Sequence, residues 1–322
     1  PTSPWTARLA SLSGTLAGRT LTGRGEVSHR DGNYGLRDVR IAHGPSHVDL
    51  NGRWGSTVDL SWSADVRTLS LLHPDLEGQL VSTGRARGSS GRPAVEGELR
   101  ARDLAVAGIT VQSLDADVDV DAADSRESRV DVRATAIHLG PLELDAARFG
   151  AHGRFAEHEL ALEFSSPGGG TQRLPGFEGR VGARGAYEDA HRTWRGSLEQ
   201  ASFEFPDGDA SLLQPAAIEA SPAGLRLAPI CLQTGDARLC AEGERRSQPG
   251  SWSLIYSAQD WPLKRLLRSI LGWKEFDGRL QAAGWLSQVQ GQDWLGGMTL
   301  LLDDPTLDIP RNKFRSERVE LG

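Results

Sequence analysis

Two cysteines are the residues of this chain with the clearest capacity for covalent chemistry. Cys231 and Cys240 are the only cysteines among 322 residues, and they flank the dipeptide Gly235-Asp236. A glycine at the first central position of a two-residue turn accepts positive φ, so this dipeptide predicts a β-hairpin. Counting outward places Cys231 opposite Cys240 in a non-hydrogen-bonded pair, where Cα atoms lie about 4.5 Å apart. The sequence therefore predicts a disulfide, with two free thiols as the alternative.

A disulfide favours an oxidising compartment such as a bacterial periplasm. A metal site on the two cysteines is not expected, because two thiolates need two further ligands and none is near in sequence. The histidines stand in no HExxH context, and we interpret them as surface residues. They are His29, His43, His47, His73, His138, His152, His158 and His191.

A series of acids resembles a calcium loop at first sight: Asp115, Asp117, Asp119, Asp121 and Asp124. Position six of such a loop would be Val120, where glycine is required, and position twelve would be Arg126, where glutamate is required. Carboxylates on the solvated face of a strand explain the series better, and they discourage edge-to-edge aggregation. Since nucleophile elbows, phosphate loops and a credible dinucleotide fingerprint are also missing, the sequence predicts no catalytic residue, no cofactor and no metal.

Charge and composition exclude several classes of protein. The net charge of −7 and a pI of about 5.7 argue against nucleic acid as a partner. Apolar residues make up 38% of the chain, less than the roughly 45–50% of compact proteins. The chain has no apolar run of 18 residues and no signal-peptide pattern. We expect it to be part of a longer protein whose membrane anchor or export signal lies outside it.

Alternation of apolar and polar residues dominates the chain and predicts strands with one apolar and one wetted face. The run from Val58 to Val66 places every apolar residue on one side, and the run from Leu114 to Asp121 does the same with a carboxylate at each outward position. The residues predicted to line an apolar groove are Val58, Leu60, Trp62, Val66, Val118, Val120, Val130, Val132, Leu142, Leu144, Leu160, Leu162 and Phe164.

A short motif recurs about every hundred residues, at 76–84, 177–185 and 276–284. Each copy has an apolar residue, an acid, Gly, a polar residue, an apolar residue and a second Gly four positions later. Repetition at a fixed period is typical of elongated arrays, although chance in a glycine-rich chain is the alternative. We therefore expect residues 1–322 to form one continuous groove segment with three pseudo-repeats.

One segment departs from the strand pattern and predicts a short amphipathic helix at about 262–272. A shorter relative is expected at Val66 to Leu72. Such a helix most often covers apolar sheet, and here it could cap the groove; binding to a membrane surface is the alternative. Its apolar residues are Leu263, Leu266, Leu267, Ile270 and Leu271.

A sheet with one apolar face must hide that face, and a long curled sheet offers an apolar floor with polar outer walls. Such a trough suits lipid acyl chains, since each CH₂ exposed to water costs about 0.8 kcal/mol. An alternative is a scaffold that pairs its strand edges with client strands. A carbohydrate-binding solenoid is a third possibility, because the nine Trp residues could supply aromatic platforms.

The order of several segments resembles the TamB and AsmA-like family of the bacterial envelope. The segments are Leu12 to Gly23, His73 to Leu104, Ile230-Cys231 and Arg238 to Gly243. The resemblance implies an all-β, elongated curled sheet of the type called a β-taco, with short amphipathic helices. It also implies an inner-membrane-anchored periplasmic protein with a TamA-like outer-membrane barrel partner. Phospholipid movement between the membranes is the implied function, and outer-membrane protein or autotransporter assembly is the alternative; the family supplies no catalytic residues.

Overall fold

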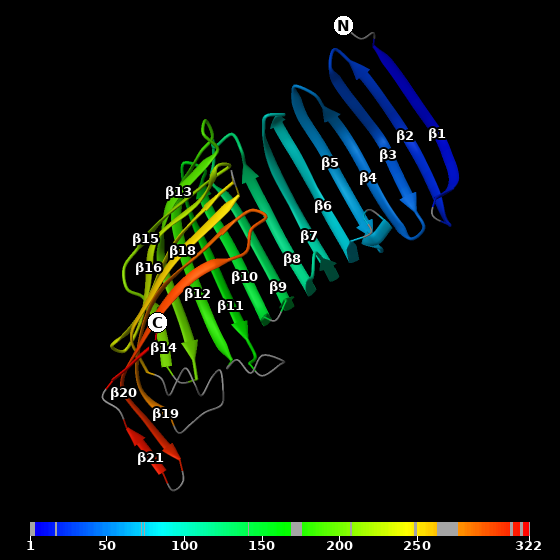
Figure 1. The fold of residues 1–322 in the computed structure, drawn as a ribbon. Helices are drawn as coiled ribbons and strands as arrows, with labels where there is room; N and C mark the ends of the chain where they lie inside the picture. Colours follow the sequence, from blue (N-terminus) through cyan, green and yellow to red (C-terminus); the bar gives the residue numbers. More distant parts are fainter. Residues whose placement is uncertain are drawn as a thin grey trace. The chain divides into compact units, whose positions relative to one another are not determined.

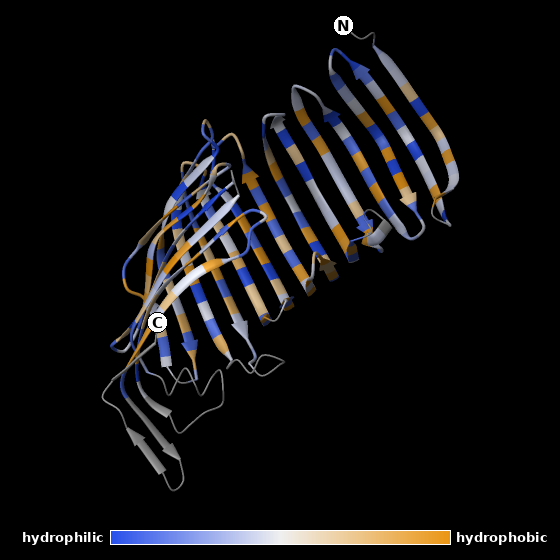
Figure 2. Cartoon of the chain, viewed as in Figure 1, coloured by the Kyte–Doolittle hydropathy of each residue, from blue (hydrophilic) through white to orange (hydrophobic). Residues whose placement is uncertain are grey.

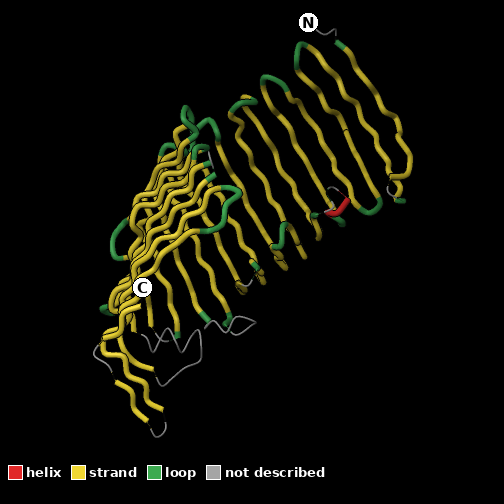
Figure 3. The backbone as a smooth tube through the Cα atoms, in the orientation of Figure 1, coloured by secondary structure: helices red, strands yellow, loops and turns green. Residues whose placement is uncertain are grey.

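The structure, a computed structural model, is built almost wholly of antiparallel β-strands (Figures 1 and 3). It describes residues 4–16, 18–71, 73, 75–140, 142–168, 176–206, 208–247, 250–262, 276–309, 312–315 and 318–321. The predicted all-β class is confirmed. The chain divides into two compact units, Pro1–Phe155 and Ala156–Gly322.

Unit 1 is a meander in which each strand pairs with the next along the chain (Figure 1). Its strands are β1 (Trp5–Leu16), β2 (Arg19–Arg30), β3 (Asn33–His43), β4 (Ser46–Trp54), β5 (Thr57–Val66), β6 (Leu76–Ser89), β7 (Arg92–Val106), β8 (Ile109–Asp121), β9 (Ser128–Leu139) and β10 (Leu142–Arg154). Turn residues such as Gly32 and Gly108 adopt positive φ between strands. A meander of this kind keeps all pairings local.

Unit 2 is also antiparallel, and two of its long strands each pair with two short ones. β13 pairs with β14 and β15, and β20 pairs with β21 and β22. The strands are β11 (Glu157–Ser166), β12 (Phe177–Glu188), β13 (Thr193–Phe205), β14 (Gly208–Leu212), β15 (Ala216–Ser221), β16 (Gly224–Thr234), β17 (Ala237–Arg246), β18 (Ser251–Pro262), β19 (Phe276–Val289), β20 (Leu295–Ile309), β21 (Asn312–Arg315) and β22 (Arg318–Leu321).

The expected helices have different outcomes. Between β5 and β6 the chain forms a single 3-10 turn, η1 (Leu69–Leu71), inside the range where a short helix was expected. The predicted groove-capping helix and its residues Leu263 to Leu271 lie outside the described residues. Among the described residues no helix is long and apolar enough to cross a bilayer.

The same bulge interrupts three strand pairs. In each, a glycine and an aspartate on adjacent strands both adopt positive φ, and the pairing register shifts at that point. The pairs are Gly25 with Asp38, Gly78 with Asp103, and Gly278 with Asp304. Bulges of this kind bend a strand and increase its twist. Two of the glycines belong to the sequence motif that recurs at 76–84 and 276–284, so the first glycine of those copies has a defined backbone role.

The hairpin of the two cysteines has the register that the sequence predicted. Thr234 pairs with Ala237, Cys231 pairs with Cys240, and Gly235 has a φ of +58°. The two sulfur atoms are bonded, with the Cα atoms 4.0 Å apart. The disulfide therefore joins β16 and β17 close to their turn.

Replacing both cysteines with serine is expected to lower the free energy of unfolding by about 2.5–3 kcal/mol, because the cross-link restricts a short loop in the unfolded chain. Urea denaturation of oxidised protein, of reduced protein and of the double variant measures this. The reduced protein should match the variant. Two alkylatable thiols in natively exported, unreduced protein would contradict the disulfide.

Candidate functional site: the apolar face of the sheet

The pairing register of unit 1 aligns apolar side chains into rows that cross many strands. Because side chains alternate between the two faces, directly paired residues share a face. One row runs Leu50, Trp62, Gly84, Gly97, Val118, Val130, Ala151. The next runs Val48, Ala64, Ser82, Leu99, Ala116, Val132, Phe149. These rows form a surface that we name the apolar face of unit 1.

The predicted groove residues of β5, β8 and β9 meet on this face. Val118 pairs directly with Val130, and Trp62 lies in the same row. Leu60 and Val120 are joined through Ala86 and Val95 in a neighbouring row. Most of these side chains are half-buried, whereas Val58 and Val66 are buried. The register thus brings together residues that lie up to 74 positions apart in sequence. Whether they carry lipid stays a prediction.

Leu142 and Leu144 occupy a different row. Leu144 pairs with Ile137, Ile137 pairs with Val111, and all three are buried. Between Ile137 and Val132 stands Ala136, whose φ is +48°. Under strict alternation Ile137 would lie on the face opposite Val132. The irregular backbone at Ala136 therefore separates the row of Leu144 and Ile137 from the apolar rows described above. The role of Leu142 and Leu144 in a groove stays a prediction.

The opposite face of unit 1 carries the charges. One row there runs Ser61, Arg85, Glu96, Asp119, Arg129. Arg85 contacts Asp59 at 2.6 Å, and Asp131 accepts from Arg129 and Arg148. The hydrogen bond from Arg129 lowers the pKa of Asp131. Figure 2 shows the resulting alternation as bands of opposite hydropathy along each strand. Each exposed ion pair of this kind adds little to the stability of the fold, but the charged groups keep this face hydrated.

Asp121 corrects the expectation of an outward carboxylate at every second position of β8. It is only 4% exposed, and it caps the turn between β8 and β9. The Ser125 hydroxyl, followed by backbone N–H groups of the turn, donates hydrogen bonds that lower the pKa of Asp121. Alternation alone could not reveal this, because a carboxylate at a strand end is equally suited to cap the turn that follows.

Unit 2 repeats the arrangement with larger side chains. Leu198, Ala201 and Ala216 are buried at its centre. Partly buried neighbours pack against them: Val181, Phe203, Leu212, Ile218, Ile230 and Leu232. The predicted groove residues of β11 join this face, since Leu160, Leu162 and Phe164 pair with Ala183, Val181 and Gly179. At one end of these strands the rings of Phe164, Phe177, Phe203 and Phe205 form a chain of contacts with centroids 5.8–6.2 Å apart.

The motif that recurs in the sequence has a common structural feature at its final glycine. In each copy this glycine lies under an aromatic ring of a neighbouring strand. A Cβ at Gly84 would lie 2.6 Å from Cη2 of Trp62. A Cβ at Gly185 would lie 2.6 Å from Cε2 of Trp194, and one at Gly284 would lie 2.6 Å from Cζ of Tyr256. The sequence motif contains the glycines but not the rings, so sequence reasoning missed the pairing.

These rings also have polar partners on the apolar face. Trp62 donates its indole N–H to Ser82 Oγ at 3.1 Å, and Trp194 donates to His158 Nε2 at 2.7 Å. Gly97 and Gly196 lie beside Gly84 and Gly185 and are close to the same two rings. A large ring can therefore lie against bare backbone and still satisfy its N–H group.

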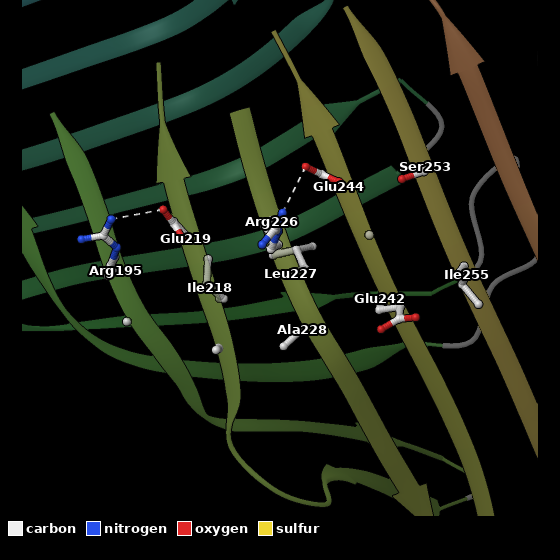
Figure 4. Close-up of a pocket in the computed structure, with 13 residues that line it drawn as sticks. Arg195, Ile218, Glu219, Arg226, Leu227, Ala228, Glu242, Glu244, Ser253 and Ile255 are labelled. Carbon is white, nitrogen blue, oxygen red and sulfur yellow. Dashed lines mark hydrogen bonds and ion pairs between the residues drawn. The ribbon is translucent and has the colours of Figure 1, made fainter. Parts of the chain in front are cut away.

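A hollow of about 500 Å³ lies on the other face of unit 2 (Figure 4). Cross-strand ion pairs occupy its rim, with Arg195 and Arg226 each 3.5 Å from Glu219 and Glu244 respectively. Hydrogen bonds from Arg246 lower the pKa of Glu244. Small residues form its floor: Gly196, Ala217, Ala228 and Gly243. Arg195 and Arg226 balance Glu219 and Glu244, which is consistent with a structural role, and Glu242 is a third carboxylate in the lining. Among the described residues no cluster of acids, histidines or cysteines could hold a metal ion.

Comparison with known proteins identifies the family. The family model described as the N-terminal domain of TamB matches residues 4–317. This chain belongs to the TamB family. A relative in Haemophilus influenzae, the translocation and assembly module subunit TamB, is 20% identical over 236 residues. The match covers 72% of this TamB-family chain and 18% of the relative, so the chain spans less than a fifth of that protein's length. No solved structure matches it.

Replacing Gly84 with Ala is expected to destabilise this TamB-family chain by about 1–3 kcal/mol, because the new methyl group would collide with the Trp62 ring and the Glu96 carbonyl. Gly150 is the matched control, since it lies in β10 and a Cβ there meets nothing within 4 Å. Gly150→Ala should change stability by no more than about 0.5 kcal/mol. Equal losses in urea denaturation would contradict the assignment of Gly84.

Replacing Asp121 with Asn is expected to destabilise the fold at neutral pH. Because the pKa of Asp121 is lowered in the folded state, its stabilisation is present above the unfolded-state pKa, about 3.9, and is lost as pH falls through the folded-state value. The difference in melting temperature between Asp121→Asn and the parent should therefore shrink as pH falls from 7 to below 4. Asp117→Asn, at an exposed position of the same strand, should show no such pH-dependent difference.

Proposed function

We propose that the chain is a periplasmic segment of a TamB-like bridge that conducts phospholipids along its apolar face between the inner and outer membranes. The observation that carries the proposal is the set of apolar rows that cross successive strands of a sheet. Among the described residues, the elements in extensive contact are those paired in the sheet, together with η1 against β6. Apolar side chains there remain partly open, including Leu162 at 36% and Met298 at 51% exposure.

The physical advantage of such a surface is large. Two acyl chains of about 16 carbons cost roughly 25 kcal/mol to expose to water at about 0.8 kcal/mol per CH₂. Rows made mainly of Ala, Val, Leu and Gly would replace water around the chains along each apolar face. Movement along such a row exchanges one apolar contact for a similar one, so it needs no bond to form or break. This supports a passive conduit with no catalytic residue and no cofactor.

Membership of the TamB family supports the cellular location and the partner proposed for this conduit. The relative's name places that protein in a translocation and assembly module, and we extend this to the present chain as part of the proposal. The protein would be anchored in the inner membrane by a segment outside this chain and would work with a TamA-like outer-membrane barrel. The Cys231–Cys240 disulfide fits an oxidising periplasm.

Photo-crosslinking residues on the two faces test the proposal. Probes at Leu60, Val118 and Leu162 should capture phospholipid in cells, because these side chains lie on the apolar faces. Matched probes one residue away, at Ser61, Asp117 and Glu163, point to the other face and should capture little. Mass spectrometry of the adducts gives the readout. Equal capture by both sets would contradict conduction along the apolar face.

A scaffold for outer-membrane protein or autotransporter assembly is the second candidate. The strand to probe is β1, whose apolar residues Leu9, Leu12 and Leu16 are 45%, 45% and 56% exposed in this chain. An exposed strand can offer main-chain groups to a client strand. In the same crosslinking experiment, adducts between β1 and nascent barrel proteins, with no lipid at Leu60 or Val118, would favour the scaffold.

A further inference from the structure

Four aromatic side chains stand in one row across the first four strands of unit 1. Trp5 on β1 pairs with His29 on β2, His29 pairs with Tyr34 on β3, and Tyr34 pairs with Trp54 on β4. Three of the rings are in contact, with the Trp5 and His29 centroids 5.9 Å apart and the His29 and Tyr34 centroids 4.8 Å apart. We name Trp5, His29, Tyr34 and Trp54 the aromatic rim.

The aromatic rim borders the apolar face at one end of the strands. Trp54 is the last residue of β4 and pairs with Val58, which belongs to the apolar face. The next row inward is aliphatic: Ala7, Val27, Leu36, Gly52, Leu60. Outward from the rim lie polar turns at 31–32 and 55–56. The order aliphatic, aromatic, polar is the order found from the interior of a bilayer to its headgroups.

The exposure of these rings indicates a surface for contact with a ligand. Trp5, Tyr34 and Trp54 are 46%, 44% and 55% exposed, although large aromatic rings are usually well buried. His29 is only 7% exposed, and its Nδ1 atom is buried with no hydrogen-bond partner in the described structure. A buried ring nitrogen without a partner is costly. In the tautomer that carries its proton on Nε2, the Nδ1 atom is an acceptor, so a group that donates an N–H to it would be favoured.

From this arrangement we infer that the aromatic rim recognises the primary ammonium of a phosphoethanolamine headgroup. Ring faces attract cations, and no arginine or lysine stands in this row to hold a phosphate. The ammonium lies against the Trp and Tyr faces and donates to His29 Nδ1 once the half-exposed Trp5 indole moves aside. The inference rests on the proposed lipid conduction and adds a headgroup preference to it.

The rim would set which lipids travel, while the aliphatic rows carry their tails. A headgroup without a positive charge, such as phosphoglycerol, gains nothing from the rings. A quaternary ammonium gains the ring contacts but cannot donate to His29. The expected order of affinity is therefore phosphoethanolamine, then phosphocholine, then phosphoglycerol.

Binding of dihexanoyl lipids with these three headgroups to the whole chain, measured by native mass spectrometry, tests the inference. The parent chain should bind the phosphoethanolamine lipid about tenfold more tightly than the phosphoglycerol lipid, as two exposed cation–π contacts would give. In a Trp5→Leu, Trp54→Leu double variant this ratio should fall severalfold, to the preference that Tyr34 and His29 still supply. His29→Leu should remove the preference for ethanolamine over choline. Trp285→Leu is the control, because that ring is 48% exposed yet lies on another strand pair, outside the rim.

The outcomes separate the two proposals. If the parent chain binds none of the three lipids, the proposed conduction itself fails. If it binds all three equally, or if the double variant keeps the parent's headgroup ratio, conduction stands and the rim inference is overturned. Far-ultraviolet circular dichroism of each variant confirms that the sheet is intact before binding is compared.

Discussion

Direct pairing of each strand with its neighbour is the constraint from which the rest of the structure follows. An antiparallel ladder satisfies the backbone hydrogen bonds and leaves each side chain only two directions. In unit 1 one direction carries Val, Ala, Leu and Gly, and the other carries Asp, Glu and Arg in paired rows. The charged face cannot turn inward without losing its water. The apolar face is therefore the one left to receive a partner, and its rows run across the strands because pairing is direct.

The positions that depart from regular pairing are few and specific. Asp38, Asp103 and Asp304 adopt positive φ, each opposite a glycine that does the same. Aspartate tolerates this conformation better than most residues because its short side chain bonds locally. A bulge shifts the register by one residue and would move a whole strand's apolar set to the wrong face if it stood alone. Across the bulge at Asp38 the apolar row of β3 stays aligned with β4, because Leu36 pairs with Gly52 and Val39 pairs with Leu50.

Sequence reasoning was strongest where one local rule decides the geometry. Strict alternation from Val58 to Val66 predicted the face of β5, and Gly235-Asp236 fixed the register of the cysteine hairpin. It was weaker where two local rules compete, as at Asp121, where alternation predicts an outward side chain and the turn recruits it as a cap. It had no access to features that depend on register between strands. The aromatic rim joins residues up to 49 positions apart, and its alignment depends on the register shifts of β1 against β2 and of β3 against β4.

The apolar rows leave little space for large side chains, and this explains how the aromatic rings are placed on the apolar face. An indole that stood upright among Ala and Val would rise above its row and obstruct anything that moves along it. Glycine at positions 84 and 97 removes two side chains beneath Trp62, so that the ring lies against the backbone. Its N–H is already bonded to Ser82, so an apolar chain that covers the ring leaves no unpaired donor. Trp194 over Gly185 and Gly196, bonded to His158, meets the same two conditions. Any partner that covers the surface needs the bonded N–H, whereas the conduction proposed above also needs the ring to lie flat.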